Sequence, residues 1–345
     1  MKTVIKKVDP ENPDEEVISQ GAEIIRAGGL VAFPTETVYG LGANGLSGEA
    51  CRRIYAAKGR PSDNPLILHI AGEEGLTSLV REVPEAARKL MEAFWPGPLT
   101  IIFPKSDMVP PEVTGGLSTV AVRFPAGKTA AALIKKSGVP IAAPSANSSG
   151  KPSPTRASHV EFDLGGKIDM IIDGGPAEVG LESTIADATA EPVALLRPGA
   201  VTLEMLREVL GEVAVDPAVL GKASDAPPKA PGMRYTHYSP IAEVFLAEGP
   251  DMAEKIRRRV REDIRSGRKA GVLATLENMD RYDAGTVLCA GSRSDLPEIG
   301  ANLFKLLRKF DYLGMDRVYC ETVPDTGEGL AIMNRLMKAA GGRKI

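Results

Sequence analysis

The sequence has few of the residues that build disulfide frameworks and metal centres. Its 345 residues include only three cysteines and three histidines. Cys51, Cys289 and Cys320 are scattered and show no paired spacing, which argues against a disulfide framework and against a structural zinc site. A histidine-based site is equally unexpected with so few histidines. We therefore expect no metal site built from the protein's own side chains.

Long apolar runs and a strong excess of charge are missing as well. No run reaches the roughly 18 apolar residues that a membrane span needs. The first ten residues lack the apolar core of a signal peptide. The net charge of −3 gives no sign, for the chain as a whole, of a nucleic-acid or membrane partner. These absences predict a soluble, cytoplasmic protein with no membrane partner, and the length suits two domains.

The stretch over residues 30–69 concentrates the features of a binding site. The apolar run at 30–33 predicts a buried strand that ends at Pro34. A Thr- and Gly-rich crossing over 35–45 and a helix over 47–58, capped by Ser47 or Gly48, are expected next. A second apolar run at 67–70 resumes the sheet. Strand ends, a glycine loop and two cations within forty residues suit an anionic ligand held over a sheet.

Strand and helix patterns alternate along both halves of the chain. In residues 1–212 we expect further strands at 1–10, 99–104, 118–124, 140–144, 168–173, 183–187 and 193–197, a loop at 109–117, and helices at 14–27, 85–94, 128–137, 159–164 and 203–210. In residues 241–345 we expect strands at 242–247, 270–275, 286–290 and 317–322, and helices at 252–266, 296–310 and 329–340. This second alternation predicts a small parallel sheet with helices on its faces. Residues 213–240, rich in Pro, Ala and Lys, predict a linker.

Two motifs resemble nucleotide-binding signatures but lack the right context. Residues 40–45 match G-x-G-x-x-G, yet residues 34–39 separate these glycines from the preceding strand, which disfavours a dinucleotide fingerprint. Residues 127–129 resemble the end of a P-loop, but Val122 stands where that motif needs glycine. A basic first turn of a helix is the better interpretation there.

The loop after the 47–58 helix carries Lys58, Arg60 and Asn64. Two cations two residues apart in a Pro-bounded loop can clamp phosphate oxygens, with Arg as a bidentate fork and Lys as a point charge. A solvated helix end, where cations complement the helix dipole, is an equally good interpretation of these residues taken alone.

Small hydroxyl residues and strand-end arginines form a second group of candidates. Residues 145–150 follow a buried strand directly and offer N–H and O–H donors to a phosphate. A nucleophilic role for Ser145 is disfavoured, because no G-x-S-x-G elbow and no evident base accompany it. Arg123 and Arg197 each end an apolar strand, which suits either a bound carboxylate or phosphate or a capping salt bridge.

Six ordered motifs together resemble one family. They are PTETVYGLG at 34–42, KGRPSDNPL at 58–66, APSANSSG at 143–150, the turn at 182–184, LLRPG at 195–199 and APGMRYTHYSP at 230–240. The chain is similar in these motifs to the threonylcarbamoyl-AMP synthase family in its long, two-domain form. The resemblance implies an α/β fold: a YrdC-like twisted mixed sheet with helices over 1–212, a linker or active-site lid over 213–240, and a smaller Rossmann-like parallel α/β domain over 241–345.

The resemblance also implies a reaction. L-threonine, bicarbonate and ATP would give L-threonylcarbamoyl-AMP, pyrophosphate and water, as the first step of N6-threonylcarbamoyladenosine formation next to the tRNA anticodon. Such chemistry needs positioning and charge neutralisation more than a side-chain nucleophile. Mg²⁺ would be carried by the ATP phosphates. A downstream tRNA threonylcarbamoyl transferase would be the partner, and direct contact with tRNA or double-stranded RNA is an open possibility.

The family's functional residues can be carried over motif by motif. The resemblance implies that Lys58 and Arg60 act in catalysis on the phosphates. It implies an ATP-binding set of Lys58, Arg60, Asn64, Thr119, Ser145, Asn147, Ser153, Arg197, Tyr235 and Tyr238, the two tyrosines serving as a lid. It implies a threonine-binding set of Thr37, His69, Arg123, Ala143 and Ser183, with Arg123 on the carboxylate.

Two other functions compete with the synthase. The first is a non-catalytic module that binds double-stranded RNA or tRNA through Arg52, Arg53, Lys58 and Arg60, which would show a steep salt dependence and no ATP turnover. The second is a carbamoyl transferase that acts directly on tRNA and forms no free adenylate. The sequence leaves the role of the C-terminal domain and the oligomeric state open.

Overall fold

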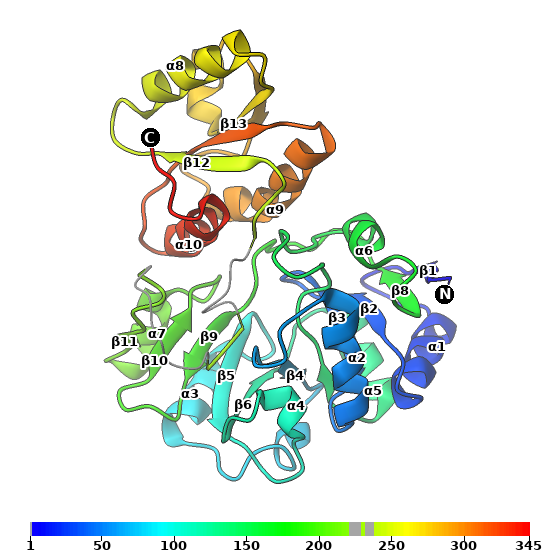
Figure 1. Cartoon of the computed structure of the whole chain (residues 1–345). Coiled ribbons are helices and arrows are strands. Elements are labelled where there is room, and N and C mark those ends of the chain that lie inside the picture. The colour runs from blue at the N-terminus through cyan, green and yellow to red at the C-terminus, as the bar shows by residue number, and fades with distance from the viewer. Residues whose placement is uncertain (1, 221–228, 232–237) are drawn as a thin grey trace. The chain divides into compact units, whose positions relative to one another are not determined.

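The computed structural model describes residues 2–220, 229–231 and 238–345. The chain divides into two compact units (Figure 1). The first contains Met1–Ser149 and Ser153–Arg234, and the second contains Gly150–Pro152 and Tyr235–Ile345. The domain boundaries expected from sequence, at 212 and 240, stay a prediction.

A mixed sheet of eleven strands forms the first unit. In spatial order its strands are β1 (Val4–Lys7), β8 (Met170–Asp173), β2 (Val31–Pro34), β3 (Tyr39–Asn44), β7 (Ile141–Ala142), β4 (Ile67–His69), β6 (Thr119–Arg123), β5 (Leu99–Pro104), β9 (Thr184–Asp187), β10 (Ala194–Arg197) and β11 (Ala214–Val215). Parallel pairs such as β4–β6 alternate with antiparallel pairs such as β5–β6. The predicted mixed α/β fold is confirmed.

Three of the seven helices described in the first unit, α1, α2 and α7, begin at a residue whose side chain caps them. They are α1 (Glu15–Arg26), α2 (Gly48–Lys58), α3 (Glu85–Phe94), α4 (Pro111–Thr114), α5 (Lys128–Ser137), α6 (Ala157–Leu164) and α7 (Leu203–Leu210), with a short 3₁₀ turn, η1, at Glu73–Leu76. The predicted cap of α2 is confirmed, because the Ser47 side chain accepts a hydrogen bond from the N–H of Ala50. Helix α4 lies inside the segment 109–117 that was expected to be a loop throughout.

Helices α1 and α5 pack on each other and on the edge of the sheet that contains β2 and β8 (Figure 1). One apolar cluster joins Ile18, Ala22 and Ile25 of α1 to Leu133 of α5 and Phe33 of β2. These side chains recur at three- and four-residue spacing along α1, so one stripe of the helix is buried. The packing fixes the first turn of α5 close to the ends of β2 and β8.

Strand β3 corrects the expectation of a glycine-rich crossing over 35–45. It pairs antiparallel with β2, and the two strands bring Phe33 opposite Gly40. A Cβ atom on Gly42 would lie 2.8 Å from both Ile141 Cγ2 and Phe33 Cε1. Close packing inside a sheet therefore requires glycine here, whereas the sequence pattern indicated a turn. Since these glycines lie within a strand, they cannot form a dinucleotide fingerprint.

The second unit is built on a separate parallel sheet of four strands. Its spatial order is β12 (Glu243–Ala247), β15 (Arg317–Glu321), β13 (Ala270–Ala274) and β14 (Thr286–Cys289), and every pair is parallel. The helices are α8 (Met252–Arg265), α9 (Leu296–Tyr312) and α10 (Glu328–Ala340), with a 3₁₀ turn, η2, at Leu276–Arg281. Helix α10 packs against α9 and β12. The predicted small parallel α/β unit is confirmed, although η2 was not expected.

Candidate active site

Lys58 joins helix α2 to the segment that follows β7. Gly59 caps α2 with a left-handed backbone, φ 63°, so the chain turns directly after the lysine. The lysine side chain is 4 % exposed, and its Nζ donates to the carbonyl of Ser145 at 2.5 Å and to that of Asn147. The predicted phosphate-binding cation and the predicted hydroxyl segment are thus brought together.

Arg60 and Asn64 close the loop after α2. Arg60 donates from Nε to the Asn64 carbonyl at 3.2 Å and from Nη2 to the Pro65 carbonyl at 2.9 Å. Asn64 is 1 % exposed, and its Oδ1 has no hydrogen-bond partner within the described residues. A buried, unpartnered acceptor is costly, so this amide is a good candidate for contact with a ligand.

Ser145 and Asn147 contact each other across the start of the next loop. The Ser145 hydroxyl donates to Asn147 Oδ1 at 2.6 Å, and Asn147 Nδ2 donates to the carbonyl of Ser148 at 2.8 Å. No base activates Ser145 through these contacts. The hydroxyl therefore acts as a hydrogen-bonding group here, as expected from the lack of a nucleophile elbow.

Arg123 occupies the centre of a second group of buried polar side chains. It ends β6 and is 4 % exposed. Its Nη1 lies 2.8 Å from Thr37 Oγ1, its Nη2 lies 2.7 Å from Glu36 Oε1, and its Nε donates to the Gly97 carbonyl at 3.2 Å. These three contacts hold the guanidinium in one orientation, which suits bidentate recognition of a carboxylate.

Glu36 balances the charge of Arg123. Burial acts to raise the pKa of Glu36, but the adjacent Arg123 charge and hydrogen bonds from Arg123 and the Ala126 N–H outweigh burial and lower this pKa. Glu36 is therefore ionised at neutral pH. Its second oxygen, Oε2, is buried and has no hydrogen-bond partner in the described part of the chain.

His69 lies directly beside Arg123 across the β4–β6 pair. The two are register partners, and His69 Nδ1 lies 3.2 Å from the Ile67 carbonyl. Burial, followed by the charge of Arg123, lowers the pKa of His69 to about 3. The imidazole is neutral at physiological pH, so it can donate or accept a hydrogen bond without adding charge.

Ser183 and Arg197 extend this group across β5, β9 and β10. The hydroxyls of Ser183 and Thr100 are 2.7 Å apart. Arg197 donates from Nε to the Ser183 carbonyl at 2.9 Å and from Nη2 to the Ser183 hydroxyl at 3.1 Å. Thr100 in turn is the register partner of Arg123. A chain of contacts therefore connects Thr37, Arg123, Thr100, Ser183 and Arg197.

The two groups are separated by one short strand. Ala143, directly after β7, donates its N–H to the Ile67 carbonyl at 2.9 Å, at the start of β4. His69 ends β4 two residues later. At a rise of about 3.3 Å per residue, Ala143 and His69 mark positions about 7 Å apart along the strand. A molecule with an anionic end at Arg123 could therefore extend along β4 toward Ala143, two residues before the Ser145 carbonyl that Lys58 contacts.

Three further predicted residues have other surroundings in the described part of the chain. Thr119 begins β6 and is half-buried. Ser153 donates a hydrogen bond to Glu182. Tyr238 belongs to the second unit, where its ring is 4 % exposed, packs on Phe304 with centroids 5.1 Å apart and lies under the Arg335 guanidinium. Tyr235 lies outside the described residues.

Comparisons with known proteins show the family of the chain. A family model described as "Telomere recombination" matches residues 23–199, and a model described as "Threonylcarbamoyl-AMP synthase, C-terminal domain" matches residues 201–341. A threonylcarbamoyl-AMP synthase from Pyrococcus abyssi is 53 % identical over 339 residues, which cover 97 % of each chain. The chain belongs to the threonylcarbamoyl-AMP synthase family.

Other members of the threonylcarbamoyl-AMP synthase family support this assignment. The enzyme of that name from Bacillus subtilis is 49 % identical and covers 98 % of this chain, with 96 % of its own length matched. The solved structure of P. abyssi Sua5 complexed with L-threonine superposes with a TM-score of 0.95 at 52 % identity, covering 99 % of both chains. The fold of this family member therefore matches a solved structure over both units.

Sequence reasoning missed three polar residues that hold this family's predicted ligand-binding residues in place. Glu36 orients Arg123, Thr100 contacts Ser183, and Glu182 accepts from Ser153. Glu36 and Glu182 lie within the quoted motifs at 34–42 and 182–184, so motif membership was a usable signal. Thr100 lies in an apolar strand and carries no such signal.

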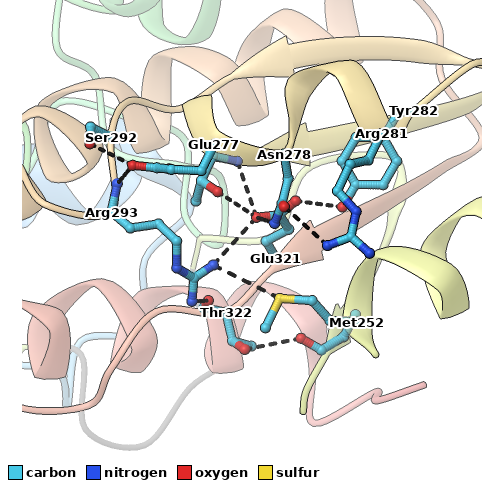
Figure 2. A network of polar contacts seen from close by, with 11 residues as sticks. Met252, Glu277, Asn278, Arg281, Tyr282, Ser292, Arg293, Glu321 and Thr322 are labelled. Carbon is cyan, nitrogen blue, oxygen red and sulfur yellow. Dashed lines mark hydrogen bonds and ion pairs between the residues drawn. The ribbon is translucent and has the colours of Figure 1, made fainter. Parts of the chain in front are cut away.

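The second unit of this synthase-family chain contains a buried polar network (Figure 2). Its centre is Glu321, which ends β15 and is 3 % exposed. Glu321 accepts hydrogen bonds from the Tyr282 hydroxyl, the Thr275 hydroxyl at 2.7 Å and Asn278 Nδ2 at 3.1 Å, and Arg293 Nη1 lies 3.4 Å away. This network was not predicted.

The described residues contain neither a cluster of metal ligands nor a membrane-spanning helix. No three His, Cys, Asp or Glu side chains in this part of the chain are grouped to hold a metal ion. None of the helices described is long and apolar enough to cross a membrane.

Proposed function

We propose that this chain is an L-threonylcarbamoyladenylate synthase, which converts ATP, L-threonine and bicarbonate to L-threonylcarbamoyl-AMP, pyrophosphate and water. The observation that carries the proposal is the buried Arg123 group, a pre-oriented carboxylate receptor in the same unit as the Lys58 group. Membership of the threonylcarbamoyl-AMP synthase family and the likeness to a structure complexed with L-threonine support it.

The threonine carboxylate would bind Arg123. Its Nη1, which now donates to Thr37, would share that hydrogen bond with the ligand. Neutral His69 and the hydroxyls of Thr37 and Ser183 would supply further hydrogen bonds, and Ala143 would supply a small, close-packed wall. A buried cation that is already oriented needs little reorganisation on binding, so it favours affinity.

ATP would bind along the Lys58 group. Lys58 and Arg60 would neutralise the phosphates, with Mg²⁺ carried on the phosphates. The remaining members of the proposed nucleotide set are Asn64, Thr119, Ser145, Asn147, Ser153, Arg197, Tyr235 and Tyr238. The unpartnered Oδ1 of Asn64 and the Ser145 hydroxyl support this placement.

The chemistry would proceed without a covalent enzyme intermediate. The threonine amine captures bicarbonate as a carbamate and releases water. A carbamate oxygen then attacks the α-phosphorus of ATP, the bond from that phosphorus to the bridging oxygen breaks, and pyrophosphate leaves. Lys58 and Arg60 stabilise the negative charge that develops on the transferring and leaving phosphates. The protein contributes mainly proximity and electrostatic stabilisation.

The proposal is tested by pyrophosphate release from ATP with purified protein, with and without L-threonine and bicarbonate, and without RNA. We expect release only when both co-substrates are present. Lys58→Ala should abolish release, while Lys89→Ala, on the exposed side of α3, should leave it unchanged. Pyrophosphate release that does not depend on threonine would overturn the proposal. The absence of release from a protein that still binds ATP would do the same, and either result would favour a nucleotide- or RNA-binding protein.

The position in tRNA modification is part of the same proposal. The adenylate would be made in the cytoplasm and passed to a transferase that modifies the adenosine next to the tRNA anticodon. Residues 233–238 would shield the adenylate from water as a lid. Replacing these residues with Gly and Ser should uncouple ATP hydrolysis from adenylate formation, and unchanged coupling would exclude the lid.

A further inference from the structure

A cavity of about 170 Å³ lies in the first unit at the ends of three neighbouring strands. Strands β1, β8 and β2 are parallel to one another, and the segments that follow all three line the cavity. The first turn of α5 supplies another wall through Gly127, Lys128 and Thr129. In α/β sheets, ligands bind at this place, where strand ends meet a helix N-terminus.

One side of the cavity offers hydrogen-bond donors. Helix α5 begins after Gly127, and no side chain caps it. The first N–H groups of a helix lack intrahelical acceptors and carry the positive end of its dipole. This first turn therefore presents donors suited to an anionic group.

An unpartnered hydroxyl lies on the same side. Thr129 is 3 % exposed, lines the cavity and has no hydrogen-bond partner for Oγ1 within the described ranges. A Cβ atom on Gly174, another lining residue, would lie 3.4 Å from this oxygen. Buried hydroxyls are normally hydrogen-bonded, so the orphan Oγ1 is an independent sign that something polar completes the cavity.

The other side of the cavity offers a carboxylate. Glu36 lines it, with Oε1 bound to Arg123 and the Ala126 N–H and with Oε2 buried and unpartnered. The two sides are close, because a Cβ atom on Gly127 would lie 3.4 Å from the Glu36 backbone nitrogen. Glu178 adds an exposed carboxylate, while Lys128 and Glu11 form an exposed ion pair, 2.7 Å apart, among the lining residues.

We propose that this cavity binds a small zwitterion of the α-amino acid class, with its carboxylate on the first turn of α5 and the Thr129 hydroxyl and its ammonium on Glu36. A simple anion such as phosphate would face Glu36 and Glu178, and a simple cation would face the positive end of α5. A molecule that carries both charges a few bonds apart satisfies the donors and the acceptor together.

A ligand bound in the cavity would affect the active site through Glu36, because Glu36 also contacts Arg123. An ammonium group on Oε2 competes with Arg123 for the charge of this carboxylate, and Arg123 is the proposed anchor of the threonine carboxylate. The ligand should therefore change the KM for threonine with little effect on kcat. This consequence, unlike the binding itself, rests on the proposed function.

Binding is tested by titration calorimetry of the full chain without ATP. The probes are glycine, L-alanine and L-valine, compared with acetate, methylammonium and inorganic phosphate, which each carry one kind of charge. We expect saturable binding of at least one amino acid that Thr129→Val weakens. Acetate and phosphate can also bind the Arg123 and Lys58 groups, so their binding should be the same in the wild-type and Thr129→Val chains. No amino-acid binding, or phosphate binding that Thr129→Val weakens, would overturn the proposal.

A matched pair of variants locates the binding. Thr129→Val keeps the shape and removes the hydroxyl, so it should weaken amino-acid binding by about tenfold, whereas Thr129→Ser should keep it. Glu36→Gln removes the charge that meets the ammonium and should abolish binding. Equal affinity in the wild-type and Thr129→Val chains would place the amino acid elsewhere. Because no turnover is measured, failure here and failure of the pyrophosphate test are distinguishable.

Discussion

Two glutamates, one in each unit, differ in how fully the protein satisfies their carboxylate oxygens. Glu321 ends β15 in the second unit, and both of its oxygens accept hydrogen bonds from neighbouring side chains. Glu36 follows β2 in the first unit, where one oxygen meets Arg123 and the other has no partner within the described residues. Both lie beyond the carboxyl end of a strand, where α/β proteins place ligands.

The difference separates a structural network from a binding site. A fully satisfied buried network rigidifies its surroundings and leaves no group for a ligand. An incomplete network keeps donors and acceptors that only another molecule can satisfy, at a cost in stability for the free protein. The first unit keeps such groups at Glu36, Asn64 and Thr129. We therefore assign ligand binding to the first unit and a structural role to the Glu321 network.

The largest expected effect is on the stability of the second unit. Glu321→Ala removes the common acceptor of Tyr282, Thr275 and Asn278, and it leaves Arg293 without its carboxylate. Breaking a buried charged network costs about 3 to 5 kcal/mol, to be measured by urea unfolding. The exposed Glu277→Ala should cost less than about 1 kcal/mol. Equal costs for the two variants would contradict a structural role for Glu321.

The next effect is on activity and belongs to the first unit. Arg123→Ala should lower kcat/KM for threonine by about 100-fold or more, because a buried, oriented partner of the carboxylate is lost. Arg123→Lys, which keeps a cation beside Glu36, should fall between the alanine variant and the wild type. The matched change in the second unit, Arg293→Ala, should leave threonine kinetics nearly unchanged. If kcat/KM for threonine fell as much in Arg293→Ala as in Arg123→Ala, threonine binding could not be assigned to the first unit alone.

A smaller effect concerns acid stability and the neutral state of His69. The pKa of His69 is about 3 in the folded chain against an ordinary value of 6.5, so the unfolded chain binds more protons between these values. Stability is therefore retained above pH 6.5 and lost as pH falls toward 3. His69→Phe should flatten the pH dependence of the urea midpoint in this window. Parallel curves for wild type and variant would show that His69 does not titrate in this way.

The smallest effect compares two buried threonines, one from each kind of network. Thr275→Val deprives Glu321 of a 2.7 Å hydrogen bond and should destabilise the protein by about 1 kcal/mol or more. Thr129→Val removes a hydroxyl that has no partner among the described residues, so the ligand-free protein should be as stable or slightly more stable. Thermal unfolding of both variants measures the two changes in stability. A larger loss of stability in Thr129→Val than in Thr275→Val would contradict the prediction.

Much of the fold could be predicted from the sequence because its patterns are local. Apolar runs and helical spacing located most strands and helices of both units, and the Ser47 cap follows from side-chain chemistry. Strand β3 was missed because its glycines are required by close packing against Phe33 and Ile141, and these two residues are distant from each other in the sequence. Single-sequence patterns do not contain that information.

The candidate site was predictable in its residue types and less so in its connections. The motifs identified Lys58 and Ser145, and Arg123 stood out as an arginine that ends an apolar strand. The structure joins Lys58 to the Ser145 segment. The supporting roles of Glu36 and Thr100 arise from register between distant strands and from loop packing. The Glu321 network escaped prediction for the same reason, because its members come from β15 and from the segments after β13 and β14.

The central claim is that the first unit joins threonine, bicarbonate and ATP into one adenylate. The most direct measurement is mass spectrometry of the product formed from ¹³C-bicarbonate, L-threonine and ATP by the full chain without RNA. The account predicts threonylcarbamoyl-AMP with one labelled carbon, lost in Lys58→Ala and Arg123→Ala and kept in Arg293→Ala. Consumption of ATP without a labelled adenylate would contradict it.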